Sequence, residues 1–283
     1  MLGHLRGAIG GMAAISRRVA LQYPTNNASR ALFQLRESRR LNPSKENPFM
    51  SDVSDQLLAH EFPRISSSSS ARLTRAVIFD LDGVLVDSFP VMREAFSVAY
   101  REVVGDGKPP FEEYSRHLGR YFPDIMRIMG LPLEMEAPFV RESYRLAHRV
   151  PLFPGVRETL LVLRKRGLRL AVATGKSGDR ARSLLDGLAV LPLLDLVTGS
   201  DEVKRPKPAP DIVLHTLDVL KLRPDEAVMV GDAVTDLDSA QSAGVAAAAA
   251  LWGTADRPGL LAARPDLVLH APADILLSCP APL

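Results

Sequence analysis

The chain has 283 residues, of which 46% are hydrophobic and 24% are charged, and its formal net charge at pH 7 is +2. These values are typical of a globular chain with one or two domains, and the small net charge gives no reason to expect a nucleic-acid partner. A single cysteine, Cys279, excludes a disulfide framework and favours a cytoplasmic setting. The longest apolar stretch, 245–252, is far too short to span a membrane.

Residues 1–72 form an N-terminal extension. Its first 50 residues contain two acids, Glu37 and Glu46, among many arginines, and it ends in the serine run 66–70, a composition typical of linkers. The basic, amphipathic start has the look of an organelle transit peptide. We favour two plainer interpretations, a disordered arm or a translation start at Met50, because nothing in the extension contributes to a site.

The first strong structural signal is the apolar run 76–79, which predicts a buried strand and is followed directly by Asp80, Leu81, Asp82 and Gly83. Ligands of open α/β sheets bind at the carboxyl ends of the strands, and residues two apart in a strand point to the same side. Asp80 and Asp82 are therefore candidates for a nucleophile and a nearby acid/base. A surface turn that happens to follow a strand is the alternative for this segment taken alone.

Residues 88–151 come next and read as a helical insertion. Apolar residues recur at helical spacing in 91–103 and in 139–147. Between these two segments, Arg116 and Arg120 stand on either side of a glycine-containing loop and are candidates for contacts with a substrate. An exposed basic helix end is an equally good explanation of these arginines.

A second buried strand, 168–174, ends in Thr174, Gly175 and Lys176. The threonine hydroxyl can donate to a phosphate oxygen, and the backbone amides around the glycine can do the same at the start of a following helix. The lysine is a further candidate for substrate binding. An ordinary strand-to-helix turn is the alternative.

Two further segments carry charged side chains that suit the same site. Lys207 stands between prolines that restrict its backbone, and its ammonium group could neutralise a carboxylate or a phosphate. The strand 228–231 is followed by Asp232 and Asp236, whose oxygens are the ligands that hard cations such as Mg²⁺ prefer. A solvated basic loop and a helix-starting aspartate are the alternatives for these segments.

Strand-like runs alternate with helix-like segments along the rest of the chain. This alternation predicts an α/β fold, a Rossmann-like parallel sheet with helices on both faces. We expect a core formed by 73–87 and 152–283, with hinges near Asp87 and Pro154. The alanine run 246–250 is expected to form a thin last strand.

These four motif segments, in this order, resemble those of the haloacid dehalogenase superfamily of phosphohydrolases, from about residue 75 to the C-terminus. The resemblance implies that Asp80 is the nucleophile that forms an aspartyl-phosphate and that Asp82 is the general acid/base. It implies that Thr174 and Lys207 bind and neutralise the phosphate. It also implies that residues 88–151 form a small α-helical cap over the site.

The same resemblance implies one cofactor, Mg²⁺. Its ligands would be Asp80, the main-chain carbonyl of Asp82, and Asp232, with Asp236 supporting the metal directly or through water. The implied partner is a small phosphorylated metabolite. No oligomeric state is predicted.

Three segments, 79–92, 119–123 and 173–178, resemble one subgroup more closely: the phosphatases associated with 3-amino-5-hydroxybenzoate synthesis in ansamycin-antibiotic pathways, which sit beside the phosphoglycolate phosphatases. This likeness implies a phosphorylated amino sugar or related substrate in a bacterium, and it disfavours the transit peptide. The alternatives are a phosphoglycolate phosphatase-like housekeeping hydrolase, a phosphosugar mutase, and a non-catalytic protein that binds a phosphometabolite.

Overall fold

The computed structural model describes residues 74–254 and 256–279. The predictions made for the extension 1–72 lie outside these residues. Within the described ranges, no helix is both long enough and apolar enough to cross a membrane.

A six-stranded sheet forms the centre of the core, and all its neighbouring strands are parallel. The strand order is β3-β2-β1-β4-β5-β6, so the direction of winding reverses between β1 and β4. This is a doubly wound arrangement, in which ligands bind where the order reverses. The predicted parallel α/β fold is confirmed. The strands are β1 (Ala76–Phe79), β2 (Arg169–Thr174), β3 (Leu196–Gly199), β4 (Ala227–Gly231), β5 (Ala246–Ala250) and β6 (Leu267–Leu269).

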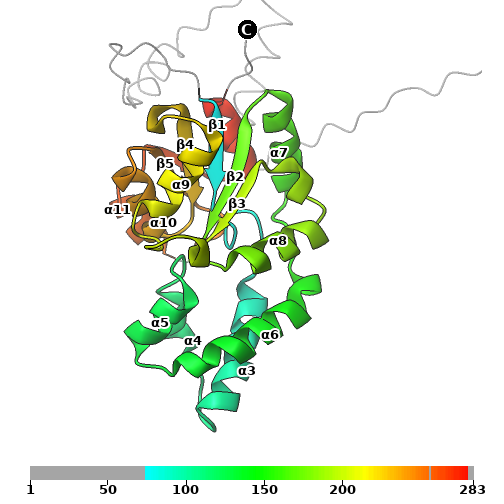
Figure 1. Cartoon of the computed structure of the whole chain (residues 1–283), viewed down its shortest axis with the longest axis vertical. Helices are drawn as coiled ribbons and strands as arrows, with labels where there is room; N and C mark the ends of the chain where they lie inside the picture. The colour runs from blue at the N-terminus through cyan, green and yellow to red at the C-terminus, as the bar shows by residue number, and fades with distance from the viewer. Residues whose placement is uncertain (1–73, 255, 280–283) are drawn as a thin grey trace, which may run out of the picture. The chain divides into compact units, whose positions relative to one another are not determined.

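Helices cover both faces of this sheet (Figure 1). Those that follow the strands are α7 (Val156–Lys165), α8 (Gly178–Gly187), α9 (Asp211–Leu220), α10 (Val234–Ser242), α11 (Arg257–Ala262) and α12 (Ile275–Ser278).

The strands are apolar on both sides because both faces are buried. Along β1, Val77 and Phe79 join a cluster with α7 and α8, whereas Ala76 and Ile78 join a second cluster with α9 and α10. All four residues are at most 4% exposed. A strand buried in this way holds its carboxyl end in a fixed position, which is what a site at that end requires.

The prediction that the alanine strand closes the sheet is wrong. β5 pairs with β4 on one side and with β6 on the other, so it lies inside the sheet. β6 has three residues, of which only Leu269 is buried, and so short a run shows no clear periodicity in the sequence. The small side chains of β5 are fully buried from Ala247 to Ala250.

The predicted helical insertion lies between β1 and α7, and we call residues 88–151 the cap. Figure 1 shows its helices grouped together beyond the carboxyl end of the sheet. They pack around a hydrophobic cluster of their own that is rich in aromatic rings, including Phe96 and Phe139. The rings of Phe122 and Phe139 stack with centroids 4.2 Å apart. The cap helices are α3 (Phe89–Val103), α4 (Phe111–Ser115), α5 (Phe122–Met129) and α6 (Glu136–Leu146).

Two neighbouring segments connect the cap to the core. Val86 and Leu152 form an antiparallel bridge. On either side of it, the backbone amide of Asp87 donates to Pro151 at 3.0 Å and that of Phe153 donates to the carbonyl of Leu85 at 3.0 Å. The two crossings of the chain are therefore paired with each other, close to the predicted hinges.

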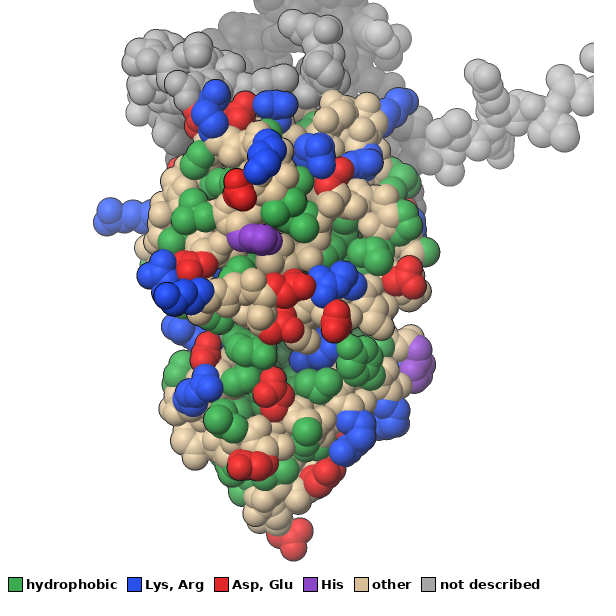
Figure 2. Space-filling model, in the orientation of Figure 1, with side chains coloured by type: hydrophobic (Ala, Val, Ile, Leu, Met, Phe, Trp, Pro, Cys, Tyr) green, Lys and Arg blue, Asp and Glu red, His purple; other side chains and the backbone are tan. Residues whose placement is uncertain are grey.

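The surface carries charges of both signs. Figure 2 shows Lys and Arg side chains interspersed with Asp and Glu over the face in view, without a broad field of one sign. This distribution matches the small net charge of the chain.

Candidate active site

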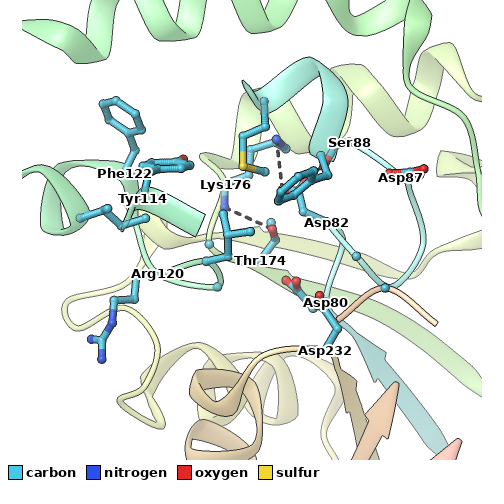
Figure 3. Close-up of a pocket in the computed structure, with 18 of the residues that line it drawn as sticks. Asp80, Asp82, Asp87, Ser88, Tyr114, Arg120, Phe122, Thr174, Lys176 and Asp232 are labelled. Atoms are coloured by element: carbon cyan, nitrogen blue, oxygen red, sulfur yellow. Dashed lines mark hydrogen bonds and ion pairs between the residues drawn. The ribbon is translucent and has the colours of Figure 1, made fainter. Parts of the chain in front are cut away.

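The site lies at the carboxyl ends of three adjacent strands. Asp80 directly follows β1, Thr174 is the last residue of β2, and Asp232 directly follows β4. Because parallel strands all end at the same edge of the sheet, residues far apart in the sequence meet here. Figure 3 shows Asp80 and Asp232 side by side, with Thr174 and Asp82 nearby.

Lys207 is the central cation of this site, and its side chain is completely buried. Its ammonium nitrogen donates to Oδ1 of Asp80 at 2.8 Å, to Oδ1 of Asp236 at 2.5 Å and to the carbonyl of Ala173 at 3.1 Å. These three bonds use all three of its donors. Lys207 is therefore held in one position against the carboxylate of Asp80.

Burial raises the pKa of the Asp80 carboxyl to about 7; the Lys207 ammonium opposes this shift, whereas the carboxylates of Asp236 and Asp82 add to it. Burial likewise raises the pKa of Asp232, with the charges of Asp236 and Asp80 adding to the effect. The ionised forms of these acids therefore need more positive charge than Lys207 supplies.

This cluster fits a hard divalent cation. Oxygens of Asp80, Asp232 and Asp236 all lie within 4.8 Å of one another, and carboxylate oxygens are the ligands of Mg²⁺. Both oxygens of Asp236 already accept hydrogen bonds, one from Lys207 and one from the backbone amide of Ala233 at 3.1 Å. Asp80 and Asp232 thus have the freer oxygens for a metal, and Asp236 chiefly holds the lysine.

Asp82 is bound on both carboxylate oxygens. The hydroxyl of Ser88 donates to its Oδ1 at 2.5 Å, and the ammonium group of Lys176 lies 3.1 Å from its Oδ2. Burial works to raise the pKa of Asp82, but the Lys176 charge and the Ser88 hydrogen bond outweigh it, so the pKa is lowered. Asp82 is therefore an ionised carboxylate whose two oxygens are both held in place, at the entrance to the cap.

The turn after β2 offers donors to an anion. The backbone amide of Lys176 donates to the Thr174 hydroxyl oxygen at 3.2 Å, so the hydroxyl proton stays free to donate elsewhere. Gly175 lines the cavity between them. This arrangement suits the prediction that Thr174 and the backbone amides around Gly175 bind a phosphate, whereas the Lys176 ammonium group is held by Asp82.

A cavity of about 80 Å³ lies over these groups, between the core and the cap. Core residues form its floor, and the apolar cap residues Phe89, Met92, Phe122, Ile125 and Phe139 form much of its wall. The cap therefore shields the carboxylates from bulk water.

A loop of the cap touches the core on two sides at Gly119. This glycine has φ +87°, and a Cβ placed on it would collide with Oγ1 of Thr235 at the start of α10. On the other side, a Cβ on Gly175 would lie 2.7 Å from the carbonyl oxygen of Gly119. Only glycine at both positions allows the loop to fit this closely.

We expect Gly119→Ala to reduce kcat/KM by about 10²-fold, because a cap displaced by an ångström misplaces the groups around the substrate. Gly130→Ala is the matched control: Gly130 also has positive φ, +63°, but its Cβ would meet nothing within 4 Å. Both variants carry similar backbone strain, about 1–2 kcal/mol, and only the first obstructs closure. Equal losses of kcat/KM in the two variants would contradict the role given to this contact.

The structure separates the two candidate cap arginines. Arg116 is exposed and pairs with Glu113 at 3.1 Å, and it does not line the cavity over Asp80. Arg120 lines that cavity, but Figure 3 shows its guanidinium turned away from the carboxylates of Asp80 and Asp232. Both arginines also line a wider opening beside α10.

Three further residues of the site were not singled out from the sequence. Ser88 binds Asp82, Tyr114 lines the cavity from α4, and Arg180 reaches the cavity from α8. Nothing local in the sequence marks them, because each is brought to the site by the packing of the cap on the core. Only the position of Arg180 on the helix after Thr174 could have pointed to it.

Comparisons with known proteins agree with the motifs. A family model described as haloacid dehalogenase-like hydrolase matches residues 77–250. The phosphoglycolate phosphatase of Chromobacterium violaceum is 34% identical over 215 residues, which cover 71% of this chain and 94% of that protein. The probable phosphatase IndB of Dickeya dadantii is 34% identical over 221 residues, which cover 71% of this chain and 91% of that protein.

A solved structure shows the same fold. The crystal structure of a predicted phosphoglycolate phosphatase from Haemophilus somnus superposes with a TM-score of 0.63 at 22% identity, covering 75% of this chain and all of that one. The resemblance inferred from the four motif segments is thus confirmed. The chain belongs to the haloacid dehalogenase-like hydrolase family and is a phosphatase of that family.

Proposed function

We propose that the protein hydrolyses a small phosphate monoester in two steps, with Asp80 as the nucleophile and Mg²⁺ as the cofactor. The observation that carries this proposal is the meeting of Asp80, Asp82 and Thr174 in one covered cavity at the edge of the sheet, with the buried Lys207 bound to Asp80 beneath it. A bound Mg²⁺ would offset the negative charge shared by the carboxylates and the phosphate.

In the first step, Asp80 attacks phosphorus and the bond to the leaving oxygen breaks. Lys207 holds Asp80 in place at 2.8 Å and stabilises the charge that develops on the transferring group. The free hydroxyl proton of Thr174 binds a phosphate oxygen. These contacts hold the Asp80 carboxylate and the phosphate in the orientation that the attack requires.

Asp82 is the proposed general acid for the leaving alkoxide and the proposed general base for the attacking water. The dianionic phosphate raises its pKa by charge repulsion, which favours the protonated acid that the leaving alkoxide needs. Once the leaving group has gone, Lys176 and Ser88 favour the ionised form, which takes a proton from the attacking water. General acid/base help of this kind contributes about 10²–10⁴-fold in rate.

The size of the cavity supports a compact substrate. Its volume of about 80 Å³ holds about five to eight water-sized groups, enough for a phosphate and a few further atoms. Together with the relative named as a phosphoglycolate phosphatase, this favours a phosphoglycolate phosphatase-like activity over the phosphorylated amino sugar of an antibiotic pathway. The role in antibiotic synthesis implied by the sequence therefore has less support than the alternative.

The setting we propose is the cytosol, and the partner we propose is a small phosphorylated metabolite. One cysteine in 283 residues suits a reducing compartment. The mixed surface charge in Figure 2 suits a protein without a nucleic-acid partner.

The decisive experiment is a screen of phosphate monoesters with purified protein and Mg²⁺, with inorganic phosphate as the measured product. We expect phosphate release to be fastest with compact esters such as phosphoglycolate. Transfer of the phosphoryl group to a second hydroxyl of a sugar phosphate, without phosphate release, would instead show a mutase. Tight binding of an ester without either reaction would show a binding protein.

Removal of residues 1–71 should leave kcat and KM unchanged within about two-fold. Every residue of the proposed site lies between Asp80 and Gly253, so the removed segment supplies none of them. Phosphate release by the full chain and the shortened chain tests this directly. A large loss of kcat in a shortened chain that melts at the same temperature would show that the extension contributes to the site.

A further inference from the structure

Arg180 is the residue of the cavity whose partners are missing. It is the third residue of α8 in the core, and its side chain contacts the cap helix α6. Its guanidinium carbon lies 5.1 Å from the ring centroid of Phe139, and one nitrogen lies 3.4 Å from the Ser143 hydroxyl. Arg180 is only 9% exposed, and its Nε has no hydrogen-bond partner among the described residues.

A guanidinium has five N–H donors, and the described residues use one of them, at long range. The other buried cations of the site are satisfied: Lys207 binds two carboxylates, and Lys176 binds Asp82. Within the described part of the chain, no carboxylate lies within ion-pair distance of Arg180. Burial lowers the pKa of its guanidinium, although the Asp82 carboxylate opposes this.

The position of Arg180 in its helix adds a second cost. A cation in the first turn of α8 faces the positive end of the helix dipole, which favours anions. Burying an unpaired charge is already unfavourable. Arg180 is thus unfavourable for the fold in two ways, and it lines the cavity over the nucleophile. This combination indicates that its missing partner is an anionic group of the substrate.

The surroundings define the chemistry of that partner. Most cap residues that line the cavity are apolar. Besides Ser88 and Arg120, Tyr114 brings a hydroxyl to it from α4, and Arg180 brings its guanidinium from α8 of the core. A planar guanidinium binds a carboxylate through two parallel hydrogen bonds, and a phenol can donate a third. In the proposed mechanism the phosphate lies at the other end of the cavity, beside Thr174 and Asp80.

We propose that Arg180, assisted by Tyr114, binds a carboxylate on the leaving group, so that the preferred substrates are small phosphorylated hydroxy acids. This inference rests on the proposed phosphatase activity and specifies its substrate class. The stack on Phe139 holds the guanidinium plane in place, so the carboxylate is recognised by orientation as well as by charge.

Two pairs of esters, matched in size, test this proposal. Phosphoglycolate is compared with ethyl phosphate, and 3-phosphoglycerate with glycerol 3-phosphate, and kcat/KM is measured for each. We expect the wild type to prefer the acid in at least one pair. In that pair, Arg180→Met should lower kcat/KM for the acid by about 10- to 150-fold. The fold-loss of kcat/KM for the matched ester without a carboxylate should be smaller by a factor of about ten or more.

Arg180→Lys should retain part of the preference, because a lysine keeps the charge but loses the paired hydrogen bonds. Arg141→Met is the matched control; Arg141 is an exposed arginine on α6 that pairs with Glu102, so it should keep the wild-type ratio. Arg120→Met tests the other arginine of the cavity, which should alter the ratio less than Arg180→Met. Thermal melting of each variant checks that it is folded.

The proposal is overturned if the wild type prefers neither acid, if Arg180→Met lowers both members of the preferred pair equally, or if Arg120→Met alone removes the preference. Failure of the proposed phosphatase activity looks different. In that case the wild type releases phosphate from none of the four esters, nor from p-nitrophenyl phosphate.

Discussion

Asp80→Asn is expected to lower the rate of phosphate release by at least about 10⁴-fold, the scale of effect seen when a covalent nucleophile is removed. The amide has nearly the same shape as the carboxylate and still accepts a hydrogen bond from Lys207, so the fold should persist. It cannot form the aspartyl-phosphate, however. Steady-state phosphate release, with thermal melting alongside, measures the effect.

Two comparisons sharpen this test. Asp82→Asn should lose less, about 10²–10⁴-fold, because it removes proton transfer and leaves the nucleophile in place. Asp124→Asn makes the same chemical change on the exposed side of α5, where the carboxylate pairs with Arg127, and should behave as the wild type. Equal residual activity of the Asp80 and Asp82 variants, well above background, would rule out the covalent route.

Removal of divalent cations is the second large effect we expect. Excess EDTA should abolish phosphate release and added Mg²⁺ should restore it, because Asp80 and Asp232 otherwise repel an incoming dianion. Asp232→Asn should raise the Mg²⁺ concentration for half-maximal activity by about 10- to 100-fold. Titration of activity with Mg²⁺ gives this value.

Asp236→Asn should raise that concentration less than Asp232→Asn does. Both oxygens of Asp236 are already bound within the protein, to Lys207 and to the amide of Ala233, so its loss should appear mainly as a lower melting temperature. Asp218→Asn, on the surface of α9 beside Lys221, is the neutral control. Full activity in excess EDTA, or a larger Mg²⁺ effect for Asp236 than for Asp232, would refute this division of roles.

The parts of the molecule that sequence alone predicted share one property: their signals are local. β1 is an unbroken apolar run that ends in charged residues, and the structure places it at 76–79 as expected. The strands that end at Thr174 and just before Asp232 are of the same kind. Because parallel strands end at one edge, their order in the chain was enough to bring Asp80, Thr174 and Asp232 together.

What the sequence did not reveal depends on packing between distant segments. Ser88 binds Asp82 only because the chain turns back at Gly83. The direction in which Arg120 points, and the reach of Arg180 to Phe139, are set by how the cap lies on the core. No periodicity within one helix carries that information, so the sequence indicates the basic loop near Gly119 but not Arg180.

The chain leaves the core and returns to it at almost the same point in space. Val86 and Leu152 face each other in an antiparallel bridge, where Cα atoms lie about 4.5–5.5 Å apart, a gap that a two-residue turn closes in an ordinary hairpin. Everything from 87 to 151 could therefore be exchanged, enlarged or deleted without altering the path of any strand. Different caps can therefore be inserted at this point during evolution. Such a change alters which substrates reach the site, while the catalytic residues of the core stay in place.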